Sequence, residues 1–239
     1  IKEIGFVKSA CEVREINKNA IVNYENFRNQ PSVQTSNISV YLRFGLISVR
    51  KLFKYAQNKN KTYCNELIWR EFFLQILYHY PQVVNENFKM KYNFIPWRNN
   101  EAEFKLWCEG KTGYPIVDAG MRELNETGYM HNRLRMIVAS FLNKHLLIDW
   151  RWGEAYFAEK LLDYDLAANN GNWQWVAGTG CDSAPYFRVF NPTTQQQKFD
   201  PDFKYINKWN PNYESIPEIV EHKLARTRYL NLVKASLIN

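Results

Sequence analysis

Apolar side chains recur every three to four residues along two long segments of this chain. In 66–80 (ELIWREFFLQILYHY) the stripe consists of Leu, Ile, Phe and Tyr, and 132–148 (NRLRMIVASFLNKHLLI) carries a similar stripe beside polar residues. This spacing matches the 3.6-residue period of an α-helix, which gathers such residues on one side. Each segment is therefore predicted to be an amphipathic helix with one buried face.

Helical patterns dominate the rest of the chain from residue 35 onward, whereas the alternation typical of strands is scarce. Proline-rich 178–202 is expected to be an ordered loop with at most short helices. The chain is long enough to bury a core without disulfides. The prediction is an all-α fold. Its further helices are expected over 38–57, 115–127, 153–162 and 218–236.

Composition limits the class of protein. The net charge of +7 allows a polyanionic partner, although a solvated lysine-rich surface explains it equally well. The four cysteines are far apart, which predicts neither a zinc site nor a disulfide framework. Because the chain has no apolar run long enough to cross a bilayer and no signal-peptide pattern, we expect a cytoplasmic protein. Residues 1–34 are polar and weakly periodic, so they are predicted to lead into a main domain over 35–239.

Helical spacing places four residues with different chemistry along one side of the first helix: Glu66, Trp69, Arg70 and Phe73. A carboxylate, an indole and a guanidinium would then lie within reach of one ligand. The commoner use of such residues is structural, with Trp69 in the core and Glu66 paired to Arg70 on the surface. The pattern alone leaves both interpretations open.

The second helix carries Asn132, Arg135 and Met136 on one face. An arginine near buried positions needs an anionic partner, either a carboxylate of the protein or a phosphate of a ligand. Asp163 and Asp165 are the internal candidates, and an Arg135 to Asp163 bridge could serve structure alone.

The segment 163–175 (DYDLAANNGNWQW) has the least ordinary composition in the chain. Consecutive Asn, Gly and Trp residues favour neither a helix interior nor a strand, so the backbone is expected to wrap a ligand there. The amides could bind the edge of a heterocycle, and the indoles could stack on it. The hydroxyl-rich segment 35–39 (TSNIS) is expected at a helix N-terminus, which suits a phosphate but more commonly serves as a cap.

Five motifs in a fixed order resemble the FAD-binding domain of the photolyase and cryptochrome family: TSNISVYLRFG, NELIWREFF, EGKTGYPIVDAGMRELNETGYMHNRLRM, DLAANNGNWQW and APYFRVFNPTTQ. The resemblance covers nearly everything from about Tyr24 to the C-terminus. It implies a multi-helical FAD-binding domain over 35–239 and a helical linker remnant over 1–34. The resemblance further implies a fragment without the family's N-terminal α/β antenna domain, so no antenna chromophore is expected on it.

The resemblance implies FAD, bound in a U-shaped form, as the cofactor. The 35–39 segment would hold its phosphates, although Asn37 replaces the more usual basic residue there. The residues that match the family's cofactor site are Tyr24, Thr35, Ser36, Ile38, Ser39, Trp69, Arg70, Asn132, Arg135, Asp163, Asp165 and Asn169.

Three tryptophans, Trp107, Trp150 and Trp173, align with the family's chain that passes electrons from the surface to the photoexcited flavin. They are expected to be catalytic together with Glu66 and with Asn169, which resembles the neutral amide facing flavin N5 in photolyases. The substrate pocket resembles that of class I cyclobutane pyrimidine dimer photolyases at Glu66, Trp69, Asn132, Met136 and Trp175.

The implied function is that of a deoxyribodipyrimidine photo-lyase: light-driven repair of pyrimidine dimers by an electron from reduced, anionic FAD. The lesion would leave the duplex, and a protonated Glu66 would bind a pyrimidine carbonyl. The implied partner is UV-damaged DNA, bound by a monomer without a membrane or metal. The residues expected to contact DNA are Arg28, Glu66, Trp69, Asn132, Arg133, Met136, Trp175, Arg188, Gln196 and Lys198.

Two other functions fit part of the same sequence. A cryptochrome-like blue-light photoreceptor would use the same FAD and tryptophans without repair. A helical DNA-binding domain without enzymatic activity would account for the basic charge alone. The missing antenna domain and the short segment between Trp209 and Pro217 leave the repair activity of the fragment open.

Overall fold

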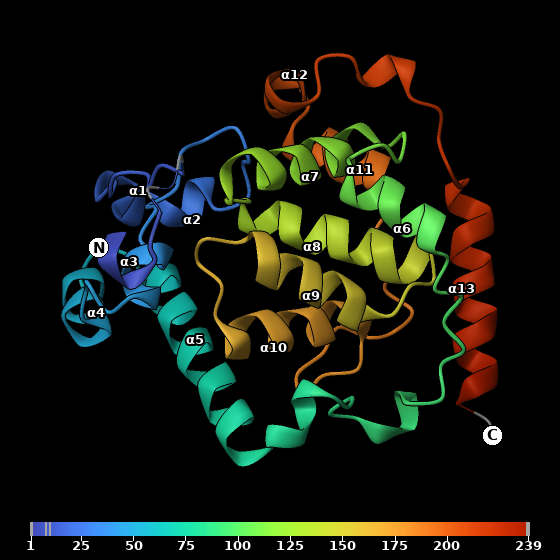
Figure 1. Cartoon of the computed structure of the whole chain (residues 1–239), viewed down its shortest axis with the longest axis horizontal. Helices are drawn as coiled ribbons and strands as arrows, with labels where there is room; N and C mark the ends of the chain where they lie inside the picture. The colour runs from blue at the N-terminus through green and yellow to red at the C-terminus, as the bar shows by residue number, and fades with distance from the viewer. Residues whose placement is uncertain (1, 8, 10, 238–239) are drawn as a thin grey trace.

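The computed structural model describes residues 2–7, 9 and 11–237. Every regular element in these residues is a helix, which confirms the all-α prediction. Figure 1 shows a stack of helices at the centre of the body. They are α7 (Pro115–Thr127), α8 (Asn132–Ser140), α9 (Trp150–Lys160) and α10 (Leu166–Ala177).

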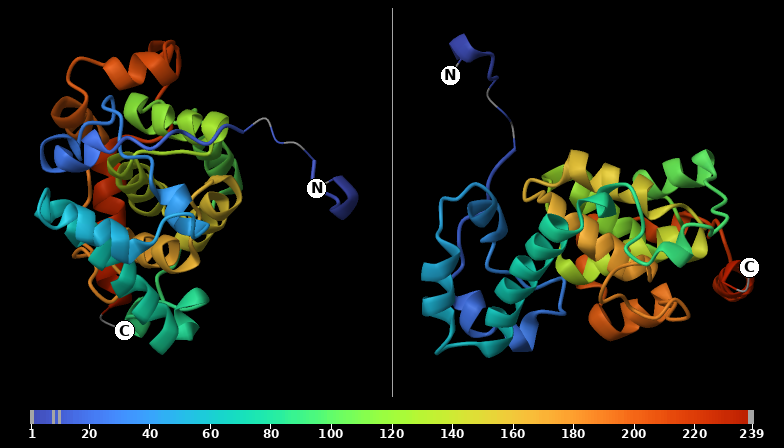
Figure 2. Two further views of the ribbon diagram at one scale, coloured as in Figure 1. Left: turned by 90° about the vertical axis from the view of Figure 1, so that its left-hand side faces the viewer. Right: turned by 90° about the horizontal axis from the view of Figure 1, so that it is seen from below.

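The other helices surround this centre. Helix α5 runs along α10 and α4, helix α12 packs on α7, and α13 covers the segment that follows α8 (Figure 1). Both views in Figure 2 show the first residues leaving the helical body. The bounds are α1 (Asn19–Val22), α2 (Tyr24–Phe27), α3 (Ser39–Arg43), α4 (Val49–Ala56), α5 (Lys61–His79), α6 (Glu101–Cys108), α11 (Pro192–Phe199), α12 (Lys204–Trp209) and α13 (His222–Ser236), with 3₁₀ turns at Lys2–Ile4, Pro81–Val84, Met90–Tyr92 and Tyr213–Ser215.

Helix α5 confirms the first predicted amphipathic helix and adds a turn before it. The side chain of Asn60 accepts a hydrogen bond from the Tyr63 amide and so caps the N-terminus. The helix ends before Pro81, which cannot continue its hydrogen bonding. Only part of the predicted stripe is buried, because Ile68 is 54% exposed.

The second predicted helix is shorter than expected. Helix α8 ends at Ser140 and passes into one π-helical turn, Phe141–His145. The chain then turns sharply at Leu147, whose φ of 55° is left-handed. The buried Asn143 amide donates to the Ile148 carbonyl and stabilises this turn. The apolar period continues through the turn because these side chains stay in the core, so the pattern alone does not reveal the break.

The prediction that 163–175 avoids helical structure is wrong, because α10 is a regular helix over most of it. The Asp165 carboxylate caps its N-terminus, and Gly178 ends it at a φ of 92°. Amides that would compete with a helix are instead bonded to other segments: Asn170 and Gln174 both donate to the Val83 carbonyl. These distant acceptors remove the local competition on which the prediction rested.

The main core lies between α7, α8, α9 and α10, and a second cluster lies at the α5 end of the molecule. In this second cluster Ile21 packs with Ile38 and Leu52, so residues before and after position 35 share one core. The division of the chain into 1–34 and 35–239 stays a prediction.

Candidate functional site

Two adjoining cavities open between α5 and the helices α8 and α10. The smaller, about 370 Å³, is called the aromatic cavity because Trp69, Phe73, Phe157, Trp173 and Trp175 line it. The larger, about 980 Å³, is called the hydroxyl cavity because hydroxyl side chains line much of it. Both volumes lie in the range of small-molecule and cofactor sites.

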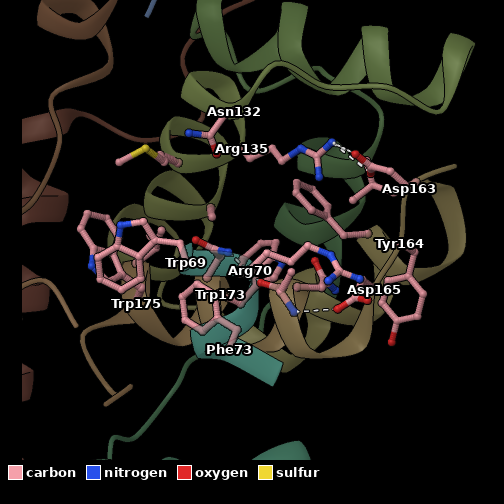
Figure 3. A pocket seen from close by; sticks show the side chains of 18 of the residues that line it. Trp69, Arg70, Phe73, Asn132, Arg135, Asp163, Tyr164, Asp165, Trp173 and Trp175 are labelled. Carbon is pink, nitrogen blue, oxygen red and sulfur yellow. Dashed lines mark hydrogen bonds and ion pairs between the residues drawn. The ribbon is translucent and has the colours of Figure 1, made fainter. Parts of the chain in front are cut away.

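The structure gathers most of the predicted site residues at these cavities. The aromatic cavity is lined by the predicted residues Arg28, Glu66, Trp69, Arg70, Asn132, Arg135, Met136, Asp163, Asp165, Asn169, Trp173 and Trp175. The hydroxyl cavity is lined by Tyr24, Thr35, Ser36, Ile38 and Ser39, and it shares with the first cavity Arg28, Glu66, Arg70, Asn132, Arg135, Asp163 and Asp165. Figure 3 shows Trp69 and Trp175 at one end of the aromatic cavity and Asp163 and Asp165 at the other.

Helix α5 presents its mixed face to the cavity rather than to the core. Trp69 is 40% exposed and meets the Phe73 ring at a tilt, with the ring centroids 6.0 Å apart. Glu66 is paired with Arg28, at 2.8 Å between Oε1 and Nη1, and not with Arg70 one turn along the helix. Burial raises the pKa of Glu66, and the Arg28 guanidinium opposes this effect. The simple i,i+4 surface pair is therefore not the arrangement adopted.

Helix α8 confirms the predicted Arg135 to Asp163 bridge. The Nη2 atom of Arg135 lies 3.0 and 3.1 Å from the two carboxylate oxygens, and its Nε donates to the Met130 carbonyl at 2.9 Å. The bridge ties the segment before α10 to α8 and leaves the Asp163 side chain only 8% exposed. Arg135 therefore shapes the cavity wall whether or not a ligand is bound.

Asn169 lies on the α10 wall of the aromatic cavity. Its Nδ2 donates to both the backbone carbonyl and the carboxylate of Glu154, at 3.0 and 2.9 Å. Burial raises the pKa of Glu154, and the bond from Asn169 lowers it. Because both acceptors fix the amide, the Asn169 oxygen is left for a group inside the cavity.

Two glycines allow the cavity walls to approach closely. A Cβ atom on Gly171 would lie 2.1 Å from the ring of Phe73, and one on Gly153 would lie 2.1 Å from the indole of Trp173. Gly171 thus brings α10 against α5, and Gly153 lets α9 pack on Trp173. This need for close approach explains the Gly in the middle of α10, which sequence reasoning attributed to a non-helical backbone.

The hydroxyl cavity lies beside the start of α3. The helix is preceded by Ile38, and no side chain caps it, so the expected capping role of 35–39 is wrong. The Ser36 hydroxyl lies 3.3 Å from the Tyr63 hydroxyl, and Thr35 donates to Asn37. Asn37 itself is buried and donates to the Glu15 carbonyl. The residue that departs from the family pattern therefore has a structural partner of its own.

Two lysines at the hydroxyl cavity were missed from the sequence. Lys204 and Lys208 both line it from α12. Their spacing of four places them on one face of that helix, which was the available signal. Lys204 is paired with Asp202 at 3.1 Å, and Lys208 adds a further positive charge to the cavity wall. An anionic ligand group in this cavity would be stabilised by their charge.

The three tryptophans of the predicted electron chain are all buried, at 0%, 1% and 3% exposure for Trp107, Trp150 and Trp173. The ring centroids of Trp107 and Trp173 are 6.3 Å apart. Trp107 does not reach the surface, because the α7, α8 and α9 core encloses it and its Nε1 donates to the buried Val138 carbonyl, and its part in electron transfer stays a prediction. In the described chain no ring pair joins Trp150 to either of the other two.

A tryptophan that does reach solvent is Trp97, which is half-buried. Its segment lies against the residues that precede Trp150: the Arg98 amide donates to Leu147 and the Asp149 amide to the Asn99 side chain. Sequence reasoning passed over Trp97. The available signal was an aromatic residue outside the predicted helical stripes, although Trp97 also packs against the cluster that contains Tyr92 and Tyr229.

The predicted DNA contacts outside the cavities divide into two groups. Arg188 and Lys198 are exposed. Gln196 is only 7% exposed, so its prediction as a phosphate contact is wrong: it lies on the inner face of α11. Arg133 is partly buried, donates to Asn29 at 2.6 Å, and lies over the Phe199 ring. Burial lowers the pKa of Arg133, and the nearby charges of Arg28 and Arg188 lower it further.

The described residues hold no group of three or more His, Cys, Asp or Glu side chains arranged for a metal ion. Across residues 2–7, 9 and 11–237, no helix combines the length and the apolarity needed to cross a membrane.

Comparison with known proteins places these features in a family. Residues 63–236 match the family model described as the FAD binding domain of DNA photolyase. The deoxyribodipyrimidine photo-lyases of Vibrio cholerae and Escherichia coli are 45% and 48% identical, each over 89% of this chain. Both alignments cover 48% of the relative, so the chain spans about half the length of the curated relatives it matches.

Solved structures agree with this assignment. A class III photolyase from Agrobacterium tumefaciens superposes with a TM-score of 0.86 at 38% identity, over 92% of this chain and 53% of its own. A cryptochrome from Synechocystis superposes with a TM-score of 0.83 at 29% identity, over 95% of this chain and 59% of its own. With most of its length matched by one family model and nearly half its residues shared with several relatives, the chain belongs to the DNA photolyase family and contains that family's FAD-binding domain.

Proposed function

We propose that this chain repairs cyclobutane pyrimidine dimers in UV-damaged DNA with light and bound FAD, as the catalytic part of a deoxyribodipyrimidine photo-lyase. The observation that carries the proposal is the content of the aromatic cavity. Residues with lesion-binding chemistry (Glu66, Trp69 and Trp175) line the same cavity as residues with flavin-binding chemistry (Asn169 and Trp173). An electron donor and a flipped pyrimidine dimer would therefore be held within one cavity.

The residues of the cavities fit FAD chemically. The hydroxyls and backbone of 35–39, with Lys204 and Lys208, suit the phosphates. The amide of Asn169 is held in place by Glu154, so its oxygen can accept a hydrogen bond from the flavin ring. Unlike a carboxyl group, an amide does not readily give up or take up a proton. Bound there in its reduced, anionic form, FAD would supply the light-driven electron for the repair.

The chain's own residues bind and orient the lesion. Trp69 and Trp175 would stack on the flipped dimer, each contact contributing roughly 1 to 3 kcal/mol. Asn132 and a protonated Glu66 would hydrogen-bond the pyrimidine edges, and Glu66 would stabilise the negative charge that the dimer carries for a short time. The electron opens the two carbon–carbon bonds of the cyclobutane ring and is then returned, so the repair consumes no reductant or water.

Phosphate contacts would come from the arginines near the cavity mouth and from Lys198. Extruding a damaged pair costs a few kcal/mol, less than an intact pair, because the lesion has already weakened stacking. We further propose that the protein acts as a monomer in the cytoplasm without a metal. An antenna chromophore is not part of the proposed repair chemistry.

The test is repair of UV-irradiated oligothymidine by the chain with added FAD and a thiol reductant. Under blue light we expect dimers to disappear, and in the dark we expect none to be lost. The absorption spectrum of the same sample reports whether flavin is bound and reduced. Bound, reduced flavin without repair would refute the proposal.

A second candidate function is blue-light sensing of the cryptochrome kind. The Synechocystis cryptochrome superposes on 95% of the chain, so the fold alone does not separate the two activities. Light-driven reduction of the flavin occurs in both. The sensor is favoured if photoreduction proceeds while irradiated oligothymidine keeps its dimers.

A further inference from the structure

An arginine holds the carboxylate of Glu66 at the mouth of the aromatic cavity. Arg28 follows the last residue of α2, and its Nη1 lies 2.8 Å from Oε1 of Glu66 on α5. Both side chains are about one-third exposed, at 29% and 31%. The pair therefore forms a link between two helices that solvent, and a ligand at the mouth, can reach.

The charges around this pair favour an additional anion. From α2, the Arg28 guanidinium also lies 5.3 Å from the Tyr24 ring centre. Arg28 and Arg188 are close enough to Arg133 to lower its pKa. Arg133 itself is bonded to a neutral group, Asn29. Several arginines thus share few carboxylates here, and a phosphate of bound DNA would be attracted to Arg28.

The other charged groups near Glu66 do not replace Arg28. On α5 itself, Arg70 lies one turn along and forms no ion pair with Glu66 in the described chain. From α8, Arg135 also lines the cavity, but it is committed to Asp163. The neutral phenol of Tyr24 is a further neighbour, and its pKa is raised by burial and by the charge of Glu66.

We propose that Arg28 couples DNA binding to the protonation of Glu66: a DNA phosphate draws Arg28 away, and the unpaired Glu66 carboxylate then takes up one proton from solvent. This inference rests on the proposed function, because it assumes that DNA enters this mouth. Arg28 acts through Glu66 and is therefore a positioning residue.

The direction of the proton transfer follows from the environment of Glu66. Burial raises the pKa of Glu66, and Arg28 is the charge that lowers it. When Arg28 leaves, burial remains, and a pyrimidine dimer in the cavity removes more water from the carboxyl. In the free protein Arg28 favours the ionised carboxylate, and in the complex its withdrawal favours the protonated acid that can donate to a pyrimidine carbonyl.

The test measures proton uptake when the FAD-loaded chain binds UV-irradiated oligothymidine in the dark. A weakly buffered solution with a pH indicator reports protons, and a separate titration ensures saturation with DNA. We expect wild-type protein to take up a fraction of a proton near neutral pH. Uptake should vanish in Glu66→Gln and should shrink in Arg28→Gln, whose Glu66 has already lost its partner.

A matched control is Arg188→Gln, which removes an arginine that does not touch Glu66. It should weaken DNA binding and leave proton uptake at saturation unchanged. A second readout is the infrared band of a protonated carboxyl, which should appear on DNA binding and be missing in Glu66→Gln. Saturated binding without uptake, or uptake that survives in Glu66→Gln, would overturn the coupling while leaving the repair proposal intact. Failure to bind irradiated DNA at all would overturn both.

Discussion

At the scale of single residues, the site depends on side chains whose partners come from distant parts of the chain. Trp173 lines the aromatic cavity and is itself almost fully buried. The indole of Trp173 is neutral at rest, so it places no permanent charge in the core. It can nevertheless lose an electron for a short time. These three tryptophans do not by themselves form an electron-transfer route from the surface to Trp173, because Trp107 and Trp150 are buried as well.

We expect Trp97→Phe to slow photoreduction of the bound flavin by an order of magnitude, because Trp97 is only partly buried and lies beside the segment that leads into Trp150. The competing surface donor is Tyr156, whose ring centroid is 5.8 Å from that of Trp107. Its hydroxyl is bonded only to neutral acceptors on Cys108 and Asn125, and burial raises its pKa to about 12.

A tyrosine without a base to take its proton is a slow electron donor, so Tyr156→Phe should leave the rate nearly unchanged. Flash photolysis of the two variants measures both rates. Fast photoreduction in Trp97→Phe together with slow photoreduction in Tyr156→Phe would show that electrons reach the flavin by way of Tyr156 and Trp107.

At the scale of elements, close helix contacts set the shape of the cavity. Gly171 in α10 faces the ring of Phe73 on α5, and no space remains for a methyl group between them. Phe73 also lines the aromatic cavity. A change in this contact should therefore affect both stability and the ligand site.

Gly171→Ala is expected to lower the free energy of unfolding by about 1 to 3 kcal/mol through overpacking. This loss outweighs the gain in helix propensity, which is about 0.5 to 1 kcal/mol. Urea unfolding provides the measurement. Combining Gly171→Ala with Phe73→Leu should cost less than the sum of the single changes, and additive costs would contradict a steric origin.

The contact of α13 with the π-helical turn buries a lysine. Lys144 is 1% exposed, and its Nζ donates to the Arg188 carbonyl at 2.8 Å. Burial, and to a lesser extent the charge of Arg188, lowers the pKa of Lys144 to about 7. The unfolded chain has an ordinary lysine, so between about pH 7 and about 10.4 it binds more protons than the folded protein.

Stability should therefore rise with pH across that window, by at most about 1.4 kcal/mol per pH unit from this residue. Lys144→Met keeps the apolar stem and removes the titrating group. We expect the slope of unfolding free energy between pH 7.5 and pH 9.5, two conditions inside the window, to be smaller in this variant. Equal slopes in the two proteins would mean that Lys144 is charged in the core.

At the scale of the whole molecule, the net charge is +7, and the basic residues behind it lie in different parts of the fold. Arg28, Arg133 and Arg188 influence one another near the cavity mouth. Helix α13 lies on the other side of the central helices from α5 (Figure 1). A polyanion that binds at the mouth should therefore depend on some basic residues and not on others.

Lys198→Gln should reduce the slope of log binding constant against log salt concentration by about 0.9 for duplex DNA. Lys234→Gln on α13 serves as the control, because this exposed lysine lies on the far helix. Its slope should match that of the wild type. Binding measured by fluorescence anisotropy at several salt concentrations distinguishes the two, and equal effects would argue for diffuse rather than directed attraction.

The sequence by itself determined the helical class, the approximate course of the main helices and the residue types that face one another along each helix. These features follow from the 3.6-residue period, which is local. The Arg135 to Asp163 bridge was also predictable, because a half-buried arginine needs a carboxylate and few were near. Most of the residues that the family motifs assigned to the cofactor and lesion sites line the two cavities.

Only the tertiary structure decided which partner each polar group takes and which aromatic rings reach solvent. Glu66 pairs with Arg28, which follows α2, and not with Arg70 on the same helix α5. The side chain of Gln196 is buried. The amides of α10 found acceptors near Val83, which allowed a helix where local preference opposes one. Hydrogen bonds and burial depend on the distance between chain segments in space. The spacing of residue types along the sequence does not specify that distance.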